Sequence, residues 1–240
     1  MAAFGLPRLH SRVVDSTNRR ARELAEEGAP GGTVVTAAEQ TAGRGRQGRT
    51  WSAPPGRALL YSAILRPLGP EHGLLPLAAA VAVAEAVESL APLECRVKWP
   101  NDVWIQGSKV AGILIEARPP EWAVIGVGLN VSIQRAEFPA GLRHPATSIG
   151  HGVAVEHALE ALNQRLGRWV DEGPEAVLEG FRSRDALRGH RVSWEGAGGE
   201  RASGSGLAEG IDERGNLVVA ADGGARESLG SGKVRLATLD

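Results

Sequence analysis

Glycine and arginine interleave in the segment E-Q-T-A-G-R-G-R-Q-G-R-T-W, which spans residues 39–51. The interleaved residues are Gly43, Arg44, Gly45, Arg46, Gly48 and Arg49. Glycine lets the backbone take positive φ and come close to a ligand. Guanidinium groups form paired hydrogen bonds to phosphate or carboxylate oxygens. The pattern therefore predicts a loop that becomes ordered around an anion.

Lysine is rare in this chain, and two of its three lysines fall in further motifs. Lys98 belongs to K-W-P-N-D, where Pro100 restricts the turn that carries Asn101 and Asp102 past the end of a strand. Lys109 begins K-V-A-G-I-L after a predicted Gly-Ser turn. At a crowded reacting centre, the planar guanidinium of arginine cannot take the place of the compact ammonium of lysine. Asp102 is suited to a magnesium ion or to proton acceptance, although N-D is also common in plain turns.

Three other glycine-containing patterns have competing interpretations. G-R-G-R-Q-G satisfies G-x-G-x-x-G, but the prolines that follow prevent the helix which a dinucleotide site requires. G-S-G-K-V at residues 230–234 has Glu227 and Val234 where a phosphate-binding loop needs glycine and a hydroxyl, so it is predicted to be a turn. Gly112 and the G-V-G-L-N motif of residues 126–130 indicate either close ligand approach or a bulge.

The elements that must position these residues follow from periodicity and turn signals. Ser16 is a candidate cap for a short helix that ends at Gly28, and the arginine loop joins two strands. Strands are predicted at residues 12–14, 33–37 and 58–65, then four in succession after residue 94, with helices at 71–90, 156–172 and 174–187. Short glycine-punctuated strands follow, as in a small β-barrel. We therefore predict one domain over residues 1–187 and a second over 188–240.

Composition limits the function classes. The formal net charge of -1 argues against DNA or other nucleic acid as a partner, since no general basic field is present. One cysteine excludes an internal disulfide, and the first residues lack a signal-peptide pattern. No apolar run is expected to reach membrane-spanning length. These features predict a cytoplasmic protein without a membrane partner.

The motifs D-S-T-N, E-Q-T-A-G-R-G-R-Q-G-R-T-W, K-W-P-N-D, K-V-A-G-I-L-I-E and G-V-G-L-N, in this order, resemble those of the biotin protein ligase family. The resemblance covers nearly the whole chain. It implies an α+β fold with a mixed or antiparallel sheet covered by helices, similar to class II aminoacyl-tRNA synthetases, and a small C-terminal SH3-like β-barrel. Too few residues precede Ser16 for the N-terminal helix-turn-helix domain of some members, so the ligase-only type is expected.

The resemblance also implies roles for individual residues. Biotin binding falls to Ser16, Thr17, Asn18, Gln40, Arg44, Gly45, Arg46, Lys109, Gly112 and Gly126. ATP binding falls to Arg46, Arg49, Trp51, Lys98, Asn101, Asp102 and Asn130, with Asp102 also on magnesium. The implied catalytic residues are Lys109, Arg44, Lys98 and Asp102. Gln47 departs from the arginine that is frequent at its position, which removes one redundant charge.

The chemistry that the resemblance implies is a pair of substitutions. The biotin carboxylate attacks the α-phosphate of Mg-ATP, giving biotinyl-5'-AMP and pyrophosphate, and a lysine of a biotin carboxyl carrier domain then displaces AMP. That carrier would belong to acetyl-CoA carboxylase or a related carboxylase. Negative charge builds on the phosphate oxygens and then on the carbonyl oxygen, so fixed cations would stabilise both transition states. Closure of the loop would exclude water, which otherwise hydrolyses the adenylate.

Two other functions are also compatible with the sequence. A lipoate or octanoate ligase or transferase of the related fold would replace ureido recognition by a longer apolar pocket. A non-catalytic biotin sensor would keep the pocket without turnover, although intact Lys109 and Asp102 argue against it. The chain is expected to be a monomer or a homodimer, and its sequence does not choose between them.

Overall fold

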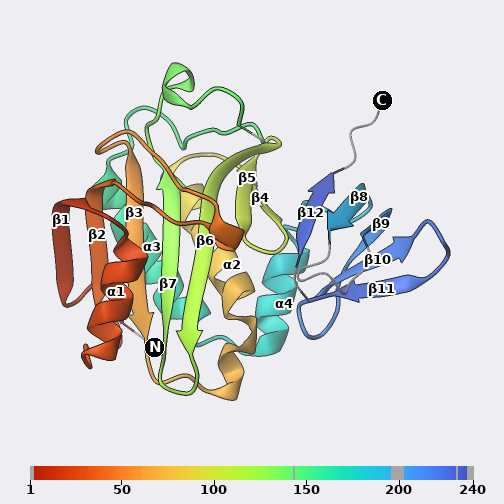
Figure 1. Cartoon of the computed structure of the whole chain (residues 1–240), viewed down its shortest axis with the longest axis horizontal. Coiled ribbons are helices and arrows are strands. Elements are labelled where there is room, and N and C mark those ends of the chain that lie inside the picture. The colour runs from red at the N-terminus through yellow and green to blue at the C-terminus, as the bar shows by residue number, and fades with distance from the viewer. Residues whose placement is uncertain (1–2, 143, 196–202, 231, 237–240) are drawn as a thin grey trace.

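The main sheet has seven strands in the order β1-β2-β3-β7-β6-β5-β4 in the computed structural model, which describes residues 3–142, 144–195, 203–230 and 232–236 (Figure 1). The strands are β1 (Arg8–Val14), β2 (Val34–Gln40), β3 (Ala58–Leu65), β4 (Cys95–Lys98), β5 (Asp102–Ile105), β6 (Ser108–Arg118) and β7 (Trp122–Asn130). β1 and β2 are parallel, and the other neighbours are antiparallel. The predicted mixed sheet is confirmed, including the four successive strands after residue 94.

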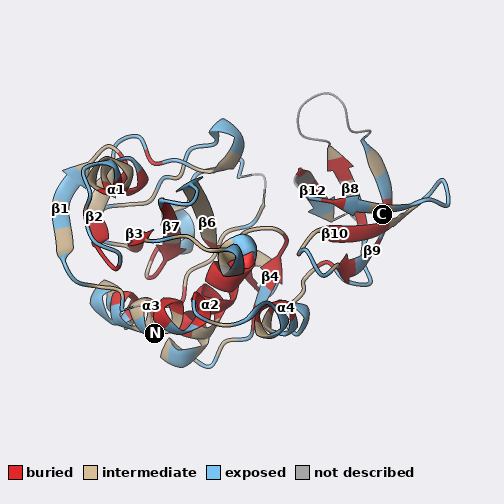
Figure 2. Ribbon diagram, turned by 90° about the horizontal axis from the view of Figure 1, so that it is seen from below, coloured by how far each residue is buried: buried red, intermediate tan, exposed pale blue. Residues whose placement is uncertain are grey.

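Helices cover both faces of this sheet (Figure 2). They are α1 (Thr17–Glu26), α2 (Leu75–Leu90), α3 (Val155–Trp169) and α4 (Pro174–Arg182). Successive strand residues face opposite sides, so Val34 packs with α2 and α3 whereas Val35 packs with α1. Both valines are almost fully buried, and the apolar strands of the centre therefore show no alternation with polar residues.

The most apolar segment lies inside this core. Residues His72–Leu90 are long and apolar enough to cross a membrane, with 19 residues and a mean hydropathy of 1.6. The expectation that no apolar run reaches that length was therefore wrong. Two-thirds of the segment, 67%, is buried within the protein, since α2 packs against the sheet with α3 on one side and α4 on the other (Figure 2). Its apolar composition is accounted for by this burial.

The C-terminal strands form a second sheet, in the order β11-β10-β9-β8-β12. They are β8 (Arg191–Glu195), β9 (Gly204–Ile211), β10 (Leu217–Ala221), β11 (Arg226–Leu229) and β12 (Lys233–Leu236), all antiparallel. The predicted small SH3-like unit is thus present as an antiparallel sheet, which is not closed into a barrel, since β11 and β12 do not pair with each other among the described residues. Of the turn predicted at residues 230–234, Gly230 is a bend, Ser231 lies outside the described residues, and Lys233 already belongs to β12.

The two sheets share one hydrophobic core. Trp194 and Val219 of the second sheet belong to the same buried cluster as α2. The turn between β9 and β10 packs against the part of the chain that forms the main sheet. There, the Trp99 indole N–H donates to the Gly215 carbonyl at 3.0 Å. The predicted boundary near Leu187 therefore separates two sheets but not two cores, and the division into domains stays a prediction.

Deleting residues 188–240 is expected to leave a folded but less stable chain. The main sheet and its helices end before Leu187, but the deletion uncovers Trp99 and removes the turn that packs on Leu74 and Leu77. Urea unfolding followed by far-UV circular dichroism measures the loss against the full chain. A truncated chain that is unfolded without urea would place the boundary elsewhere.

Candidate active site

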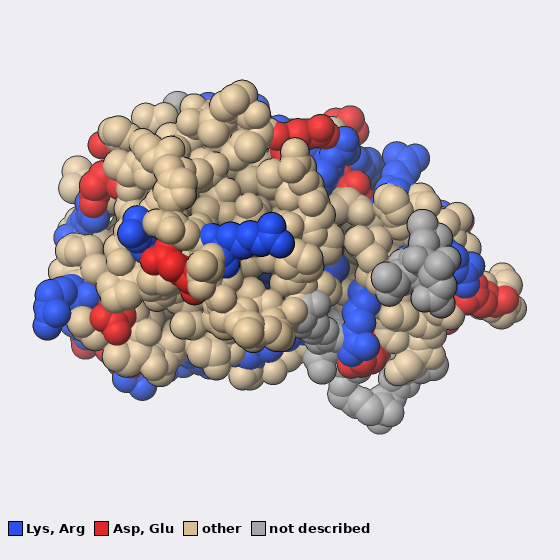
Figure 3. All heavy atoms as spheres, turned by 90° about the horizontal axis from the view of Figure 1, so that it is seen from above, with Lys and Arg blue, Asp and Glu red and all other residues tan. Residues whose placement is uncertain are grey.

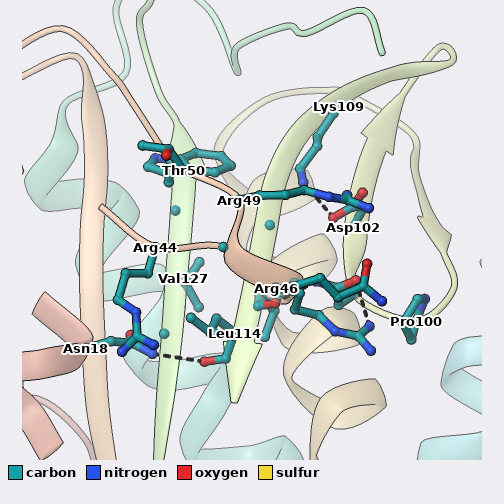
Figure 4. Close-up of a pocket in the computed structure, with 18 of the residues that line it drawn as sticks. Asn18, Arg44, Arg46, Arg49, Thr50, Pro100, Asp102, Lys109, Leu114 and Val127 are labelled. Carbon is teal, nitrogen blue, oxygen red and sulfur yellow. Dashed lines mark hydrogen bonds and ion pairs between the residues drawn. The ribbon is translucent and has the colours of Figure 1, made fainter. Parts of the chain in front are cut away.

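One pocket gathers the motifs of the sequence. It lies against β6 and β7, between the N-terminus of α1 and the ends of β4 and β5, and the arginine loop crosses it (Figure 4). Fifteen of the sixteen predicted site residues line it, which are Ser16, Thr17, Asn18, Gln40, Arg44, Gly45, Arg46, Arg49, Trp51, Lys98, Asn101, Asp102, Lys109, Gly112 and Gly126. Asn130 is the exception, because its buried amide donates to the Thr147 carbonyl outside this pocket.

A buried polar network forms one end of the pocket. Ser16 caps α1, and Thr17 follows with its backbone N–H donating to Gln40 Oε1 at 2.7 Å. Ser62 Oγ of β3 lies 2.9 Å from Thr17 Oγ1 and 2.6 Å from Asn18 Oδ1. Ser62 is fully buried and was not predicted as a site residue, since nothing near it in sequence carries a motif. This end of the pocket offers hydrogen-bonding groups that are held in fixed positions.

The glycines of β7 make room for side chains of the protein. A Cβ on Gly126 would come within 1.9 Å of Asn18 Oδ1, and one on Gly128 within 2.3 Å of the Trp51 ring. Gly112 also lies under Trp51, where a Cβ would be 3.2 Å from the ring. The close approach predicted from these glycines is therefore made by pocket-lining residues. Asn18 and Trp51 sit directly on bare backbone of the sheet.

The arginine loop is a folded hairpin in this structure. Gly45 N–H donates to the Arg49 carbonyl at 2.7 Å, and a single turn of 3-10 helix spans Arg46–Gly48. Gly48 has a positive φ of 73°, as predicted, and the non-glycine residue Gln47 has a φ of 56°. The positive φ predicted for Gly45 was wrong, because its φ is -120°. Gly43 is needed for another reason, since a Cβ there would meet the Trp51 carbonyl at 2.3 Å. The loop geometry rests on close packing as much as on positive φ.

Two arginines of the loop reach across the pocket to other elements. Arg46 Nη1 donates to Asn101 Oδ1 at 3.2 Å, and Arg44 Nη1 donates to Glu116 Oε1 at 3.1 Å. Burial lowers the pKa of Arg46 below its ordinary value, against the opposing charge of Asp102. A partly desolvated guanidinium gains much from an anionic ligand, which supports an anion at this point of the pocket.

Lys109 and Asp102 form an ion pair beside Trp51. The Nζ–Oδ1 distance is 2.6 Å, and Nζ lies 5.6 Å from the centre of the Trp51 ring. The hairpin between β5 and β6 turns at Gln106 and Gly107, both with positive φ, rather than at the predicted Gly-Ser pair. A register shift between Val103 and Trp104 places Lys109 opposite Trp104, two positions along β5 from Asp102.

A second lysine lies beside a histidine that the sequence did not suggest. Lys98 is 5% exposed at the end of β4, and its Nζ lies 3.4 Å from His144 Nε2. Trp104 lies 5.1 Å below the same ammonium and packs on the His144 ring. The segment after His144 is tied to Lys109, whose backbone N–H donates to Pro145 and whose carbonyl accepts from Thr147. The segment of residues 144–147 therefore contacts both Lys98 and Lys109.

The pocket has little capacity for a metal of its own. Within the described ranges, no three His, Cys, Asp or Glu residues cluster as a metal site. Asp102 is the one carboxylate among the lining residues that the structure describes. Magnesium commonly binds through one or two carboxylates together with substrate phosphates and water, so this donor set fits an ion brought by a nucleotide. On the face shown in Figure 3, basic side chains lie beside a hollow in the larger part of the molecule.

Comparison with known proteins places this pocket in a family. Residues 10–130 match the model of the biotin/lipoate A/B protein ligase family, and residues 191–236 match the biotin protein ligase C terminal domain. The biotin--[acetyl-CoA-carboxylase] ligase of Mycobacterium tuberculosis is 36% identical over 225 residues, covering 86% of this chain and 82% of that protein. The bifunctional ligase/repressor BirA of Bacillus subtilis is 37% identical over 179 residues, covering 69% of this chain.

The chain spans 55% of the length of that Bacillus relative, which is about half. Among solved structures, the biotin protein ligase from Aquifex aeolicus in complex with biotin and ATP matches with a TM-score of 0.84 and 27% identity. That match covers 97% of this chain and all of the other. The likeness therefore extends over both sheets and includes the pocket.

Proposed function

The chain belongs to the biotin/lipoate A/B protein ligase family, and from this premise we propose that it activates biotin with ATP and transfers it to a carrier lysine. The main observation behind the proposal is that one pocket has a buried polar end and a positively charged end. Thr17, Asn18 and Gln40 offer hydrogen bonds to an uncharged polar group such as a ureido ring. Arg46, Lys109 and Lys98 offer charge to a carboxylate and phosphates.

In the first step, a carboxylate oxygen of biotin forms a bond to the α-phosphorus of ATP, and the bond to the departing pyrophosphate breaks. Lys109 and Arg46 lie where they can neutralise charge on the reacting oxygens, and Lys98 lies further along for the leaving phosphates. Trp51 offers a flat wall for the adenine ring. Asp102, together with Asn101, would hold a magnesium ion, which would screen phosphate charge when bound.

In the second step, the amine of a carrier lysine attacks the carbonyl carbon of the mixed anhydride, and AMP leaves with the bonding electron pair. The amine must lose a proton, and Asp102 is placed to accept it once Lys109 has turned to the substrate. Loop closure limits the competing attack of water. We propose a carrier domain of acetyl-CoA carboxylase or a related carboxylase as acceptor, in the cytoplasm, with no role for DNA.

The decisive test is transfer of labelled biotin to a carrier domain with ATP and Mg²⁺. ATP–pyrophosphate exchange that depends on biotin, but not on lipoate or octanoate, is the expected partial reaction. Exchange driven by lipoate instead would favour a lipoate or octanoate ligase, since the matching family includes both biotin and lipoate ligases. Tight biotin binding without exchange or transfer would indicate the sensor. Sedimentation with and without biotin and ATP separates the monomer from the homodimer.

Replacing Ser62 by alanine is expected to raise the KM for biotin about tenfold with little change in kcat. The buried hydroxyl fixes Asn18 at 2.6 Å, and leaving Asn18 Oδ1 without this donor costs about 1–1.5 kcal/mol. Pyrophosphate exchange over a range of biotin concentrations measures the effect. Ser89→Ala is the control, since the Ser89 hydroxyl donates to the Ala86 carbonyl within α2, away from the pocket. Equal KM values in the two variants would remove Ser62 from the site.

A further inference from the structure

Glu116 stands at the rim of the pocket without a role in the proposed reaction. It lies on β6 two residues beyond Leu114 and four beyond Gly112, so its side chain shares the face of the strand that lines the pocket. Its side chain is 21% exposed. Glu116 is not itself among the residues that line the pocket, and both of its carboxylate oxygens already accept from protein side chains, so it acts on the protein rather than on the ligand.

The two oxygens of this carboxylate bind two different elements. Glu116 Oε2 accepts from Asn18 Nδ2 of α1 at 3.0 Å. Glu116 Oε1 accepts from Arg44 Nη1 of the arginine loop at 3.1 Å. Figure 4 shows the Arg44 side chain reaching from the loop toward Asn18. One carboxylate thus joins the sheet to the polar end of the pocket and to the loop that crosses it.

The strength of the contact with Arg44 suits a loop that must open and close. The Arg44 side chain is 49% exposed, and ion pairs of this exposure are weak and screened by salt. Such a pair biases the loop toward the closed position without preventing release of products. The contact with Asn18 is more buried, since Asn18 itself is only 5% exposed.

We propose that Glu116 is a positioning residue that retains the arginine loop over the pocket through Arg44 and orients Asn18 through its other oxygen. The second part rests on the proposed function, because it assigns Asn18 to biotin. Loss of the loop contact raises the open population and lets water reach the adenylate. Loss of the Asn18 contact weakens biotin binding itself.

Two substitutions separate these parts. Glu116→Gln keeps an oxygen that can accept from Asn18 but loses the charge that pairs with Arg44, whereas Glu116→Ala loses both. Glu121→Gln is the matched control, because Glu121 forms an exposed ion pair with Arg118 at 3.3 Å on the same hairpin. Limited trypsin digestion without ligand, with mass mapping of the nicked peptides, reports opening of the loop.

Cleavage after Arg44, Arg46 and Arg49 is expected to be about two- to fivefold faster in Glu116→Gln and Glu116→Ala than in the wild type or Glu121→Gln. In pyrophosphate exchange, the KM for biotin should stay near the wild-type value in Glu116→Gln and rise at least threefold in Glu116→Ala, with kcat within about twofold in both. Hydrolysis of the adenylate to AMP without carrier should increase in both variants.

Wild-type nicking rates in Glu116→Gln would overturn the retention of the loop, and so would a uniform increase at arginines throughout the chain. The same biotin KM in both variants would overturn the role toward Asn18. If the wild type supports no biotin-dependent exchange, the proposed function fails. The ligand-free digestion still decides the role of Glu116 on the loop, so the two failures are distinguishable.

Discussion

Lys109→Ala is expected to slow adenylate formation about a hundredfold while the chain stays folded. The Lys109 ammonium lies 2.6 Å from Asp102 and beside Trp51, on the pocket wall where charge must be neutralised as the carboxylate attacks phosphorus. A preorganised cation of this kind contributes about 3 kcal/mol to the transition state. Biotin-dependent ATP–pyrophosphate exchange measures the rate, and thermal unfolding measures the fold.

Three further variants test whether the loss of exchange belongs to the Lys109 ammonium itself. Lys109→Arg should also be impaired, because the planar fork does not reproduce a compact charge in a tight site. Arg118→Ala removes an exposed cation outside the pocket and should keep full exchange. Adding Asp102→Asn to Lys109→Ala relieves an unpaired carboxylate, so it should recover thermal stability without recovering exchange. Near-wild-type exchange in Lys109→Ala would show that Lys109 is peripheral.

Gly128→Ala is expected to raise the KM for ATP about thirtyfold. The added carbon would lie 2.3 Å from the Trp51 ring, far inside van der Waals contact, so the ring must move away from the sheet. Displacing the ring removes the proposed adenine wall, at a cost of about 2 kcal/mol for the lost apolar contact. Exchange rates over a range of ATP concentrations, at saturating biotin, measure the change.

Gly223→Ala serves as the matched control, since the added carbon there meets no atom within 4 Å. It should leave both KM values unchanged. An unchanged KM for ATP in Gly128→Ala would mean that Trp51 does not bound the adenine site. A parallel increase in the KM for biotin would mean that the ring supports both ends of the pocket.

Most of the elements, and the loops that carry the charged motifs, were predictable from the sequence. The apolar run of β3 (Ala58–Leu65) was predicted with its observed bounds, because apolar and β-branched residues between prolines and glycines leave few alternatives. Ser16 does cap α1, and the arginine loop does join two strands. These features depend on residues close together in the chain, so short-range pattern is enough to predict them.

Weakly patterned strands were predicted less well. β1 begins at Arg8, four residues before its predicted start, and its half-exposed residues show no apolar run. β11 (Arg226–Leu229) was missed, because only Leu229 of its four residues is buried. Strands at sheet edges acquire their structure from pairing with a neighbour rather than from their own composition.

The residues that hold the pocket-lining side chains in place became visible only in the three-dimensional structure. Ser62 reaches Asn18 across 44 residues of chain, and Glu116 reaches Arg44 across 72. Neither carries a signal of its own, since a serine within a strand and a glutamate near a strand end are common. Their roles arise from register, where Ser62 and Leu114 flank Gly126 on neighbouring strands and Asn18 rests on that glycine. Register is set by the packing of both faces of the whole sheet, which no local pattern in the sequence contains.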